Sequence, residues 1–126
     1  MAKSVKDFLA TAQATVPKLQ PNQLREMIGR PDVVLVDVRD APELQQTGKI
    51  RGALHIQRGM IEFRADPSTP YHNPALTKDR TIVLYCASGG RSALAGKALQ
   101  EMGYESVYNA GGIKELTDAG LETEPV

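Results

Sequence analysis

Two long apolar runs in the middle of the chain constrain its fold more than any other feature. Residues 33–38 and 81–85 are rich in valine, leucine and isoleucine, and neither run alternates apolar with polar positions. A strand with one face in water shows that alternation, whereas a strand covered on both faces does not. Both runs are therefore predicted to be central strands of a largely parallel sheet.

Helical signals lie between and around these strands. Ser4 with Asp7, and Asp40 with Glu43, have the spacing of a capping box at the start of a helix. After the second run, apolar residues recur at helical spacing as far as Gly103, and this stripe comprises Leu94, Ala95, Ala98, Leu99 and Met102. Helices are also expected at 21–28, 41–47 and 113–118, with a helical turn at 60–64 and short strands within 50–56 and at 107–108. Alternating strands and helices indicate an α/β domain.

Charge and cysteine content exclude several classes of function. Fifteen basic residues balance fifteen acidic ones among the 126 residues, so nucleic acid is not an expected partner. A single cysteine excludes an internal disulfide and a thiolate zinc cage, which suits a reducing compartment. The first 16 residues contain no continuous apolar stretch, so neither a signal peptide nor a membrane span is expected, and the predicted location is cytoplasmic.

The candidate chemistry is concentrated at Cys86, directly after the second apolar run. Open parallel sheets bind ligands beyond the carboxyl ends of their strands. The small residues 87–90 allow backbone N–H groups to turn inward and bind an anion at the start of a helix. These amides, the helix dipole and Arg91 should lower the pKa of Cys86 and so favour a nucleophilic thiolate. The alternative is an inert buried cysteine, which the glycine-rich loop disfavours.

Several motifs, in order along the chain, resemble one family. The loop from Cys86 to Ser92 is similar to the active-site loop of rhodanese-domain sulfurtransferases, and residues 36–39 resemble the family's strand ending in Asp-x-Arg. Residues 48–53 resemble its Gly-His-Ile-Pro-Gly-Ala motif, with lysine and arginine in place of histidine and proline. Gly111 and Gly112 match the glycine pair before its last helix, although Leu116 stands where tryptophan is frequent.

The resemblance implies a three-layer fold with a mostly parallel central sheet of about five strands flanked by helices. Residues 1–16 would form an amphipathic helix, which is expected to pack on its own domain, and residues 17–126 the rhodanese-like domain. It also implies transfer of a sulfane sulfur from thiosulfate or a persulfide, through a Cys86 persulfide, to an acceptor such as cyanide or a thiol. The partners would be small-molecule or protein persulfide donors and acceptors, and the chain a monomer or homodimer.

The resemblance also suggests roles for the site residues. Cys86 and Arg91 would be catalytic, with Arg91 holding the loop and the anionic donor. Ser92 is expected to cap the helix rather than to hydrogen-bond the persulfide. The predicted substrate-binding loop comprises Ala87, Ser88, Gly89, Gly90, Arg91 and Ser92. Asp37 and Arg39 would orient the loop, unless they form a solvated surface pair. Independently of the resemblance, residues 87–90 include no basic side chain, so a wider anion site would have to use Arg39, Arg58 or Arg64.

Other functions remain open at this point. The same fold supports phosphatases and arsenate reductases, although these carry five residues between cysteine and arginine where this chain has four, and phosphatases usually have histidine at the position of Tyr85. A sulfur carrier or redox-sensing module without turnover is the other alternative. His55 and His72 lie in no metal-ligand pattern, so no metal or cofactor is expected.

Overall fold

Four parallel strands form the central sheet, in the order β3-β1-β4-β5. The computed structural model describes residues 2–126. The strands are β1 (Val33–Asp37), β3 (Leu54–His55), β4 (Thr81–Cys86) and β5 (Val107–Gly112). The two predicted central strands, β1 and β4, lie side by side in the middle of the sheet and are buried on both faces, which confirms the prediction.

The central sheet has one strand fewer than the expected five or so. On the outer side of β5, residues 2–126 form only a single bridge, between Lys18 and Asn109, and helix α2 begins shortly afterwards at Pro21. The remaining short strands, β2 (Lys49–Ile50) and β6 (Thr123–Glu124), pair antiparallel in a separate two-stranded sheet. These pairings are too short to leave a periodic pattern in the sequence.

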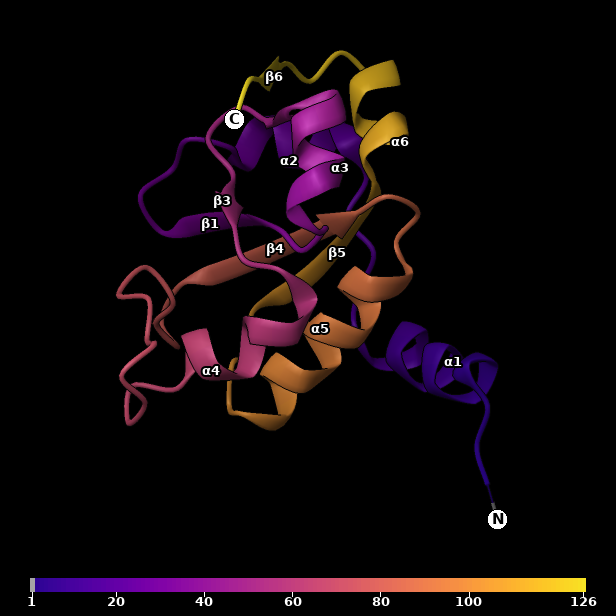
Figure 1. Ribbon diagram of the computed structural model, residues 1–126, viewed down its shortest axis with the longest axis vertical. Helices are drawn as coiled ribbons and strands as arrows, with labels where there is room; N and C mark the ends of the chain where they lie inside the picture. The colour runs from indigo at the N-terminus through magenta and orange to yellow at the C-terminus, as the bar shows by residue number, and fades with distance from the viewer. Residues whose placement is uncertain (1) are drawn as a thin grey trace.

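Helices cover both faces of the sheet and give the three layers that were predicted (Figure 1). One face carries α1 (Val5–Thr15), the 3-10 turn η1 (Arg58–Met60), α4 (Ile61–Ala65) and α5 (Gly90–Glu101). The other face carries α2 (Pro21–Met27), α3 (Ala41–Thr47) and α6 (Ile113–Asp118). Each face has its own apolar core: Cys86 belongs to the core beneath α5, and Leu35 to the core beneath α2 and α6.

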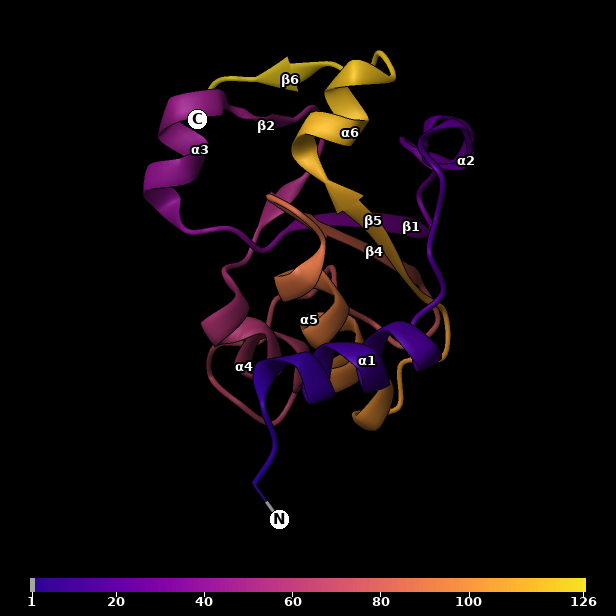
Figure 2. The ribbon, with the colours of Figure 1, turned by 90° about the vertical axis from the view of Figure 1, so that its right-hand side faces the viewer.

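The first helix packs across α5 rather than on the sheet (Figure 2). Its predicted capping box is present, because Ser4 and Asp7 exchange hydrogen bonds of 2.9 and 3.3 Å. Only part of its apolar stripe is covered, since Val5 and Phe8 are exposed. The division of the chain at residues 16 and 17 stays a prediction, and Met1 lies outside the described residues.

The buried face of α5 differs from the predicted stripe. Ala95 and Leu99 are buried as expected, whereas Leu94, Ala98 and Met102 are only half-buried. The helix also buries Gly96, where a Cβ atom would lie 2.9 Å from a methyl group of Val16. The small residue allows Val16, which follows α1, to approach α5 closely, so the buried face of α5 includes Gly96.

A buried tyrosine helps to hold the long connection after β3, whose residues Ile61, Ala65 and Leu76 also pack in the core. The Tyr104 hydroxyl lies 2.7 Å from the Ala65 carbonyl oxygen and 3.1 Å from that of Leu76, so it bridges the two ends of the irregular segment. The predicted helical turn at 60–64 corresponds to α4, one residue later. No helix within residues 2–126 combines the length and the apolar character needed to cross a membrane.

Candidate active site

Cys86 is the last residue of β4, and its side chain is fully buried. It is paired with Gly112, the last residue of β5, so the two carboxyl ends meet at the predicted edge of the sheet. The following residues, Ala87 and Ser88, are exposed and lead directly into α5 at Gly90. The sulfur atom therefore lies beneath a short exposed loop at the amino terminus of a helix.

Two hydrogen-bond donors approach the sulfur of Cys86. The backbone N–H of Gly89 donates to Sγ at 3.0 Å, and the hydroxyl of Ser92 lies 3.5 Å from it. Burial raises the pKa of the Cys86 thiol. Hydrogen bonds from the Ser92 hydroxyl and from backbone amides of the loop and helix together lower this pKa by more than burial raises it. The net effect is a lowered pKa, as the sequence predicted.

Gly111 and Gly112, at the end of β5, leave room for the loop because they have no side chains. A Cβ atom on Gly112 would lie 2.3 Å from the carbonyl oxygen of Ala87, which is too close for two non-bonded atoms. Gly89 has a φ of 101° and begins α5 in a left-handed conformation that favours glycine. The loop thus lies against the backbone of β5, and side chains at these positions would displace it.

Asn109 is a site residue that the sequence analysis missed. Its Oδ1 accepts hydrogen bonds from the Ser92 hydroxyl at 2.8 Å and from the Gly111 N–H at 2.9 Å. Its Nδ2 donates to the carbonyl oxygen of Gly89 at 3.1 Å. One buried amide therefore holds the loop, the first turn of α5 and the end of β5 together. An asparagine directly after the predicted strand at 107–108, and inside the longer observed strand β5, was the signal that could have identified it.

The prediction that Ser92 caps the helix was wrong. Gly89 occupies the N-cap position, and Ser92 is the third residue of α5, buried in its first turn. Because Gly89 adopts a positive φ, α5 begins at Gly90, before the position that a Ser92 cap would require. The Ser92 hydroxyl therefore lies next to the sulfur instead of at the helix end.

Arg91 is bound by a carboxylate from another helix. Its Nη1 and Nη2 lie 2.7 and 2.9 Å from Oε1 and Oε2 of Glu43 in α3. The hydrogen bond from Arg91 is the main cause that lowers the pKa of Glu43 to about 2, and the same contact raises the pKa of the arginine. The sequence analysis considered Glu43 only as a capping residue. The guanidinium is thus already paired within the protein.

Asp37 and Arg39 form a buried ion pair, so the alternative of a solvated surface pair is wrong. Arg39 Nη2 lies 2.8 Å from Asp37 Oδ2, and both side chains are at most 2% exposed. Arg39 also donates to the Thr47 hydroxyl and to the Gly48 carbonyl oxygen, each at 2.8 Å. The structure gives the pair no hydrogen bond to residues 87–92. It ties the end of β1 to the end of α3, the helix that carries Glu43.

The remaining predicted residue, Arg58, pairs with Glu62 at 2.9 Å within its own helical turn rather than with the loop. His55 Nε2 lies 2.6 Å from the carbonyl oxygen of Arg39, and His72 Nε2 lies 3.1 Å from that of Leu76. Within residues 2–126, no three His, Cys, Asp or Glu side chains are grouped as a metal site would require.

A parallel sheet with a buried cysteine at the carboxyl end of a central strand, beneath an amide-lined loop, defines a class of α/β cysteine-loop domains. This chain belongs to the rhodanese-like domain family, whose sequence model matches residues 20–119. The resemblance and the fold class predicted from sequence are thereby confirmed.

Individual relatives include sulfurtransferases. Thiosulfate sulfurtransferase PspE of Escherichia coli strain K12 is 36% identical over 81 residues, which are 64% of this chain and 71% of the relative. The polysulfide-sulfur transferase homodimer of Wolinella succinogenes is 31% identical, with a TM-score of 0.75 over 94% of this chain and 85% of that chain. A Rhodopseudomonas palustris protein of unknown function, described as a possible tyrosine phosphatase, is 38% identical, with a TM-score of 0.89 over 98% and 96%.

Proposed function

We propose that this protein is a sulfurtransferase that carries a sulfane sulfur on Cys86. The observation behind the proposal is the environment of the sulfur atom: Sγ accepts the Gly89 N–H at 3.0 Å, lies 3.5 Å from the Ser92 hydroxyl, and has a lowered pKa despite its burial. Donors in this position stabilise a thiolate, which is the nucleophilic form of cysteine. They would also stabilise the terminal anionic sulfur of a persulfide.

The reaction consists of two displacements at one sulfur atom. The Cys86 thiolate attacks the outer sulfur of thiosulfate or of a persulfide, the donor S–S bond breaks, and sulfite or a thiolate leaves with the bonding electrons. Cys86 then carries a persulfide. Cyanide or a thiolate attacks its outer sulfur, the new S–S bond breaks, and the Cys86 thiolate is restored. No net oxidation or reduction is needed, and no cofactor enters the scheme.

The loop residues have different roles in this proposal. The amides of residues 87–90 and the Ser92 hydroxyl surround the transferred sulfur. Arg91 acts as a positioning residue, because its pairing with Glu43 joins the start of α5 to α3. Arg39, which is paired with Asp37 at the end of β1, supports that arrangement through its hydrogen bonds to Thr47 and Gly48 at the end of α3. Arg58 is paired with Glu62 and has no part in this scheme.

Phosphatase chemistry is the less favoured alternative. Four residues separate Cys86 from Arg91, one fewer than in the phosphatases that use this arrangement. The arginine that would bind a phosphate is also held by Glu43 through two hydrogen bonds. The Rhodopseudomonas relative makes a phosphatase assay a necessary control, with para-nitrophenyl phosphate as substrate.

Intact-protein mass spectrometry after brief exposure to thiosulfate tests the proposal, with glutathione persulfide as a second donor. The wild type should gain one sulfur atom, and cyanide should remove it as thiocyanate. Cys86→Ser, which keeps a residue of similar size at the strand end, should gain none. Sulfur loading without release to cyanide or thiols would indicate a carrier without turnover. Absence of sulfur loading from both donors would contradict the proposal. The mass measured under native conditions would distinguish a monomer from a homodimer.

A further inference from the structure

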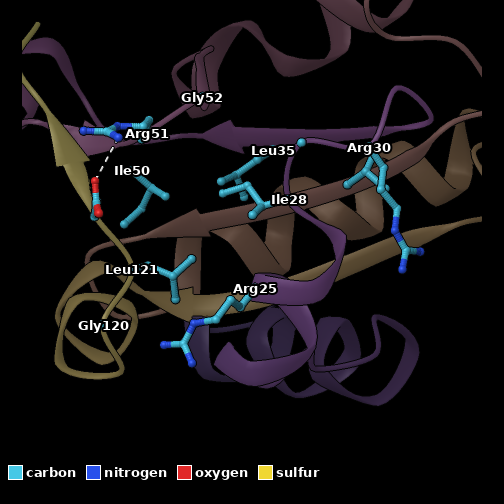
Figure 3. A pocket seen from close by; sticks show the side chains of 12 residues that line it. Arg25, Ile28, Arg30, Leu35, Ile50, Arg51, Gly52, Gly120 and Leu121 are labelled. Atoms are coloured by element: carbon cyan, nitrogen blue, oxygen red, sulfur yellow. Dashed lines mark ion pairs between the residues drawn. The ribbon is translucent and has the colours of Figure 1, made fainter.

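A cavity of about 510 Å³ lies on the face of the sheet opposite Cys86 (Figure 3). Its walls come from the turn between α2 and β1, from β1 itself, from the turn after β2 and from the turn between α6 and β6. None of its lining residues belongs to the loop 86–92. Its volume falls within the range of small-molecule sites. The sulfur chemistry proposed above does not use it.

The floor of this cavity is aliphatic. Leu35, Ile50 and Leu121 belong to the core on this side of the sheet, and Ile28 and Val33 cover its edge as half-buried side chains. Figure 3 shows the side chains of Ile28, Leu35, Ile50 and Leu121 around one common space. No aromatic residue lines it, so the floor suits a flexible aliphatic group better than a flat ring.

The rim of the cavity is basic. Arg25, Arg30 and Arg51 lie around it, whereas Glu122 is the one acidic residue of its lining (Figure 3). Glu122 is paired with Arg51 at 2.9 Å. Arg25 donates to the backbone carbonyl of Ala119, and neither it nor Arg30 pairs with a carboxylate in the part of the chain described by the structure. Because the whole chain has no net charge, this positive excess is a local feature.

We propose that the cavity binds a small amphiphile: an aliphatic chain that ends in a single anionic group. The aliphatic chain lies against Leu35 and Leu121 and against the more exposed Ile28 and Val33. The anion lies at the rim near Arg25, whose side chain Figure 3 shows on the side of Leu121, whereas Arg30 lies at the opposite end of the cavity. Arginine guanidinium groups match the geometry of carboxylates and phosphates. The aliphatic floor supplies the hydrophobic contribution to binding. Both features are needed, since a short anion lacks contact with the floor and a neutral chain lacks contact with the rim.

Octanoate is a suitable probe, followed in ¹H–¹⁵N spectra of the full-length chain. The amides of Gly29, Gly52 and Gly120 lie in the cavity wall, whereas Gly59 and Gly103 lie outside it and serve as internal controls. Octanoate should shift the first three signals in a saturable manner. Acetate and 1-octanol should bind at least about tenfold more weakly, the loss expected when one charged hydrogen bond or the apolar contact is missing.

Arginine variants test the rim directly. Arg25→Gln should weaken octanoate binding severalfold. Because this change also removes the hydrogen bond to the Ala119 carbonyl oxygen, unchanged glycine signals in the free protein would verify the fold. Arg30→Gln, at the opposite end of the cavity, should weaken binding less, and it removes no side-chain hydrogen bond found within residues 2–126. Arg64→Gln, outside the cavity, is the matched control and should bind as the wild type does. Equal binding of octanoate and 1-octanol, or no binding of octanoate, would overturn the proposal, whatever the result of the sulfur-loading assay. Octyl phosphate would show whether the rim distinguishes a phosphate from a carboxylate.

Discussion

Arg91 and Glu43 form a two-bond ion pair, with N–O distances of 2.7 and 2.9 Å, between residues 48 positions apart in the chain. The pair connects the first turn of α5, which follows the Cys86 loop, to α3. The arginine that looked like a ligand for an incoming anion therefore already has an anionic partner supplied by the protein.

This ion pair should make stability depend on pH in the acid range. The pKa of Glu43 is lowered to about 2 from 4.5, so its contribution is fully present above pH 4.5 and is lost as the pH falls towards 2. Glu43→Gln should lower the free energy of unfolding near pH 7 by about 1 kcal/mol, since the pair is one-third exposed. Urea unfolding at pH 7, 4.5 and 3 checks this. The difference in the free energy of unfolding between Glu43→Gln and the wild type should be smaller at pH 3 than at pH 7. Glu62→Gln, which breaks the exposed pair with Arg58, is the control, and a difference independent of pH would contradict the argument.

A positioning role for Arg91 predicts that it acts together with Glu43. Arg91→Ala and Glu43→Gln should each slow sulfur loading by about tenfold, mainly through kcat, because each leaves the start of α5 less well placed. The double variant should be little slower than either single one. Steady-state assays of the four proteins with thiosulfate and cyanide measure this coupling. If Arg91 instead binds the donor, its loss should raise KM strongly while Glu43→Gln leaves KM unchanged.

Ser92→Ala should raise the pKa of the Cys86 thiol, because the hydroxyl that stabilises the thiolate is lost. At pH 7 the fraction of thiolate falls, and the alkylation rate with iodoacetamide falls with it. The full pH profile of that rate should move to higher pH. Ser88→Ala changes an exposed hydroxyl in the same loop while keeping its amide, and its profile should match the wild type. A shift of equal size in both variants would argue against the role of Ser92.

Gly112→Ala should impair sulfur loading more than folding. The added Cβ atom would lie 2.3 Å from the Ala87 carbonyl oxygen, so the loop must move away from β5 and its amides from the sulfur. We expect a loss of about 100-fold in the loading rate, the scale on which small displacements act. Gly59→Ala, where a Cβ atom meets nothing within 4 Å, is the matched control. Mass spectrometry gives the loading rate and urea unfolding the stability. A loading rate equal to that of the control would show that the glycine does not shape the site.

Features encoded in short stretches of sequence were predicted well. The apolar runs correctly predicted β1 and β4, and the spacing of Ser4 and Asp7 predicted the start of α1. The small residues after Cys86 predicted the loop. Each of these depends on neighbours a few positions apart, which is the range over which periodicity and capping operate.

Features that depend on distant residues could not be predicted in this way. Nothing local to Glu43 indicates that it meets Arg91, and nothing local to Asn109 indicates that it bonds to Ser92. The cap prediction for Ser92 failed because Gly89 turns the chain into the helix earlier than the serine would. The cavity on the opposite face is formed by turns spread along the chain, and the sequence analysis did not identify it.

The complete burial of Cys86 has a consequence for oxidation. Its sulfur is not exposed, while Ala87 and Ser88 above it are. Peroxide and other oxidants need direct access to a thiolate, and they convert it stepwise to forms that are not readily restored. A thiolate buried in this way is shielded from such damage. In the proposed reaction the sulfur donor must reach the same buried atom, so the burial that slows oxidation also limits the rate of sulfur loading.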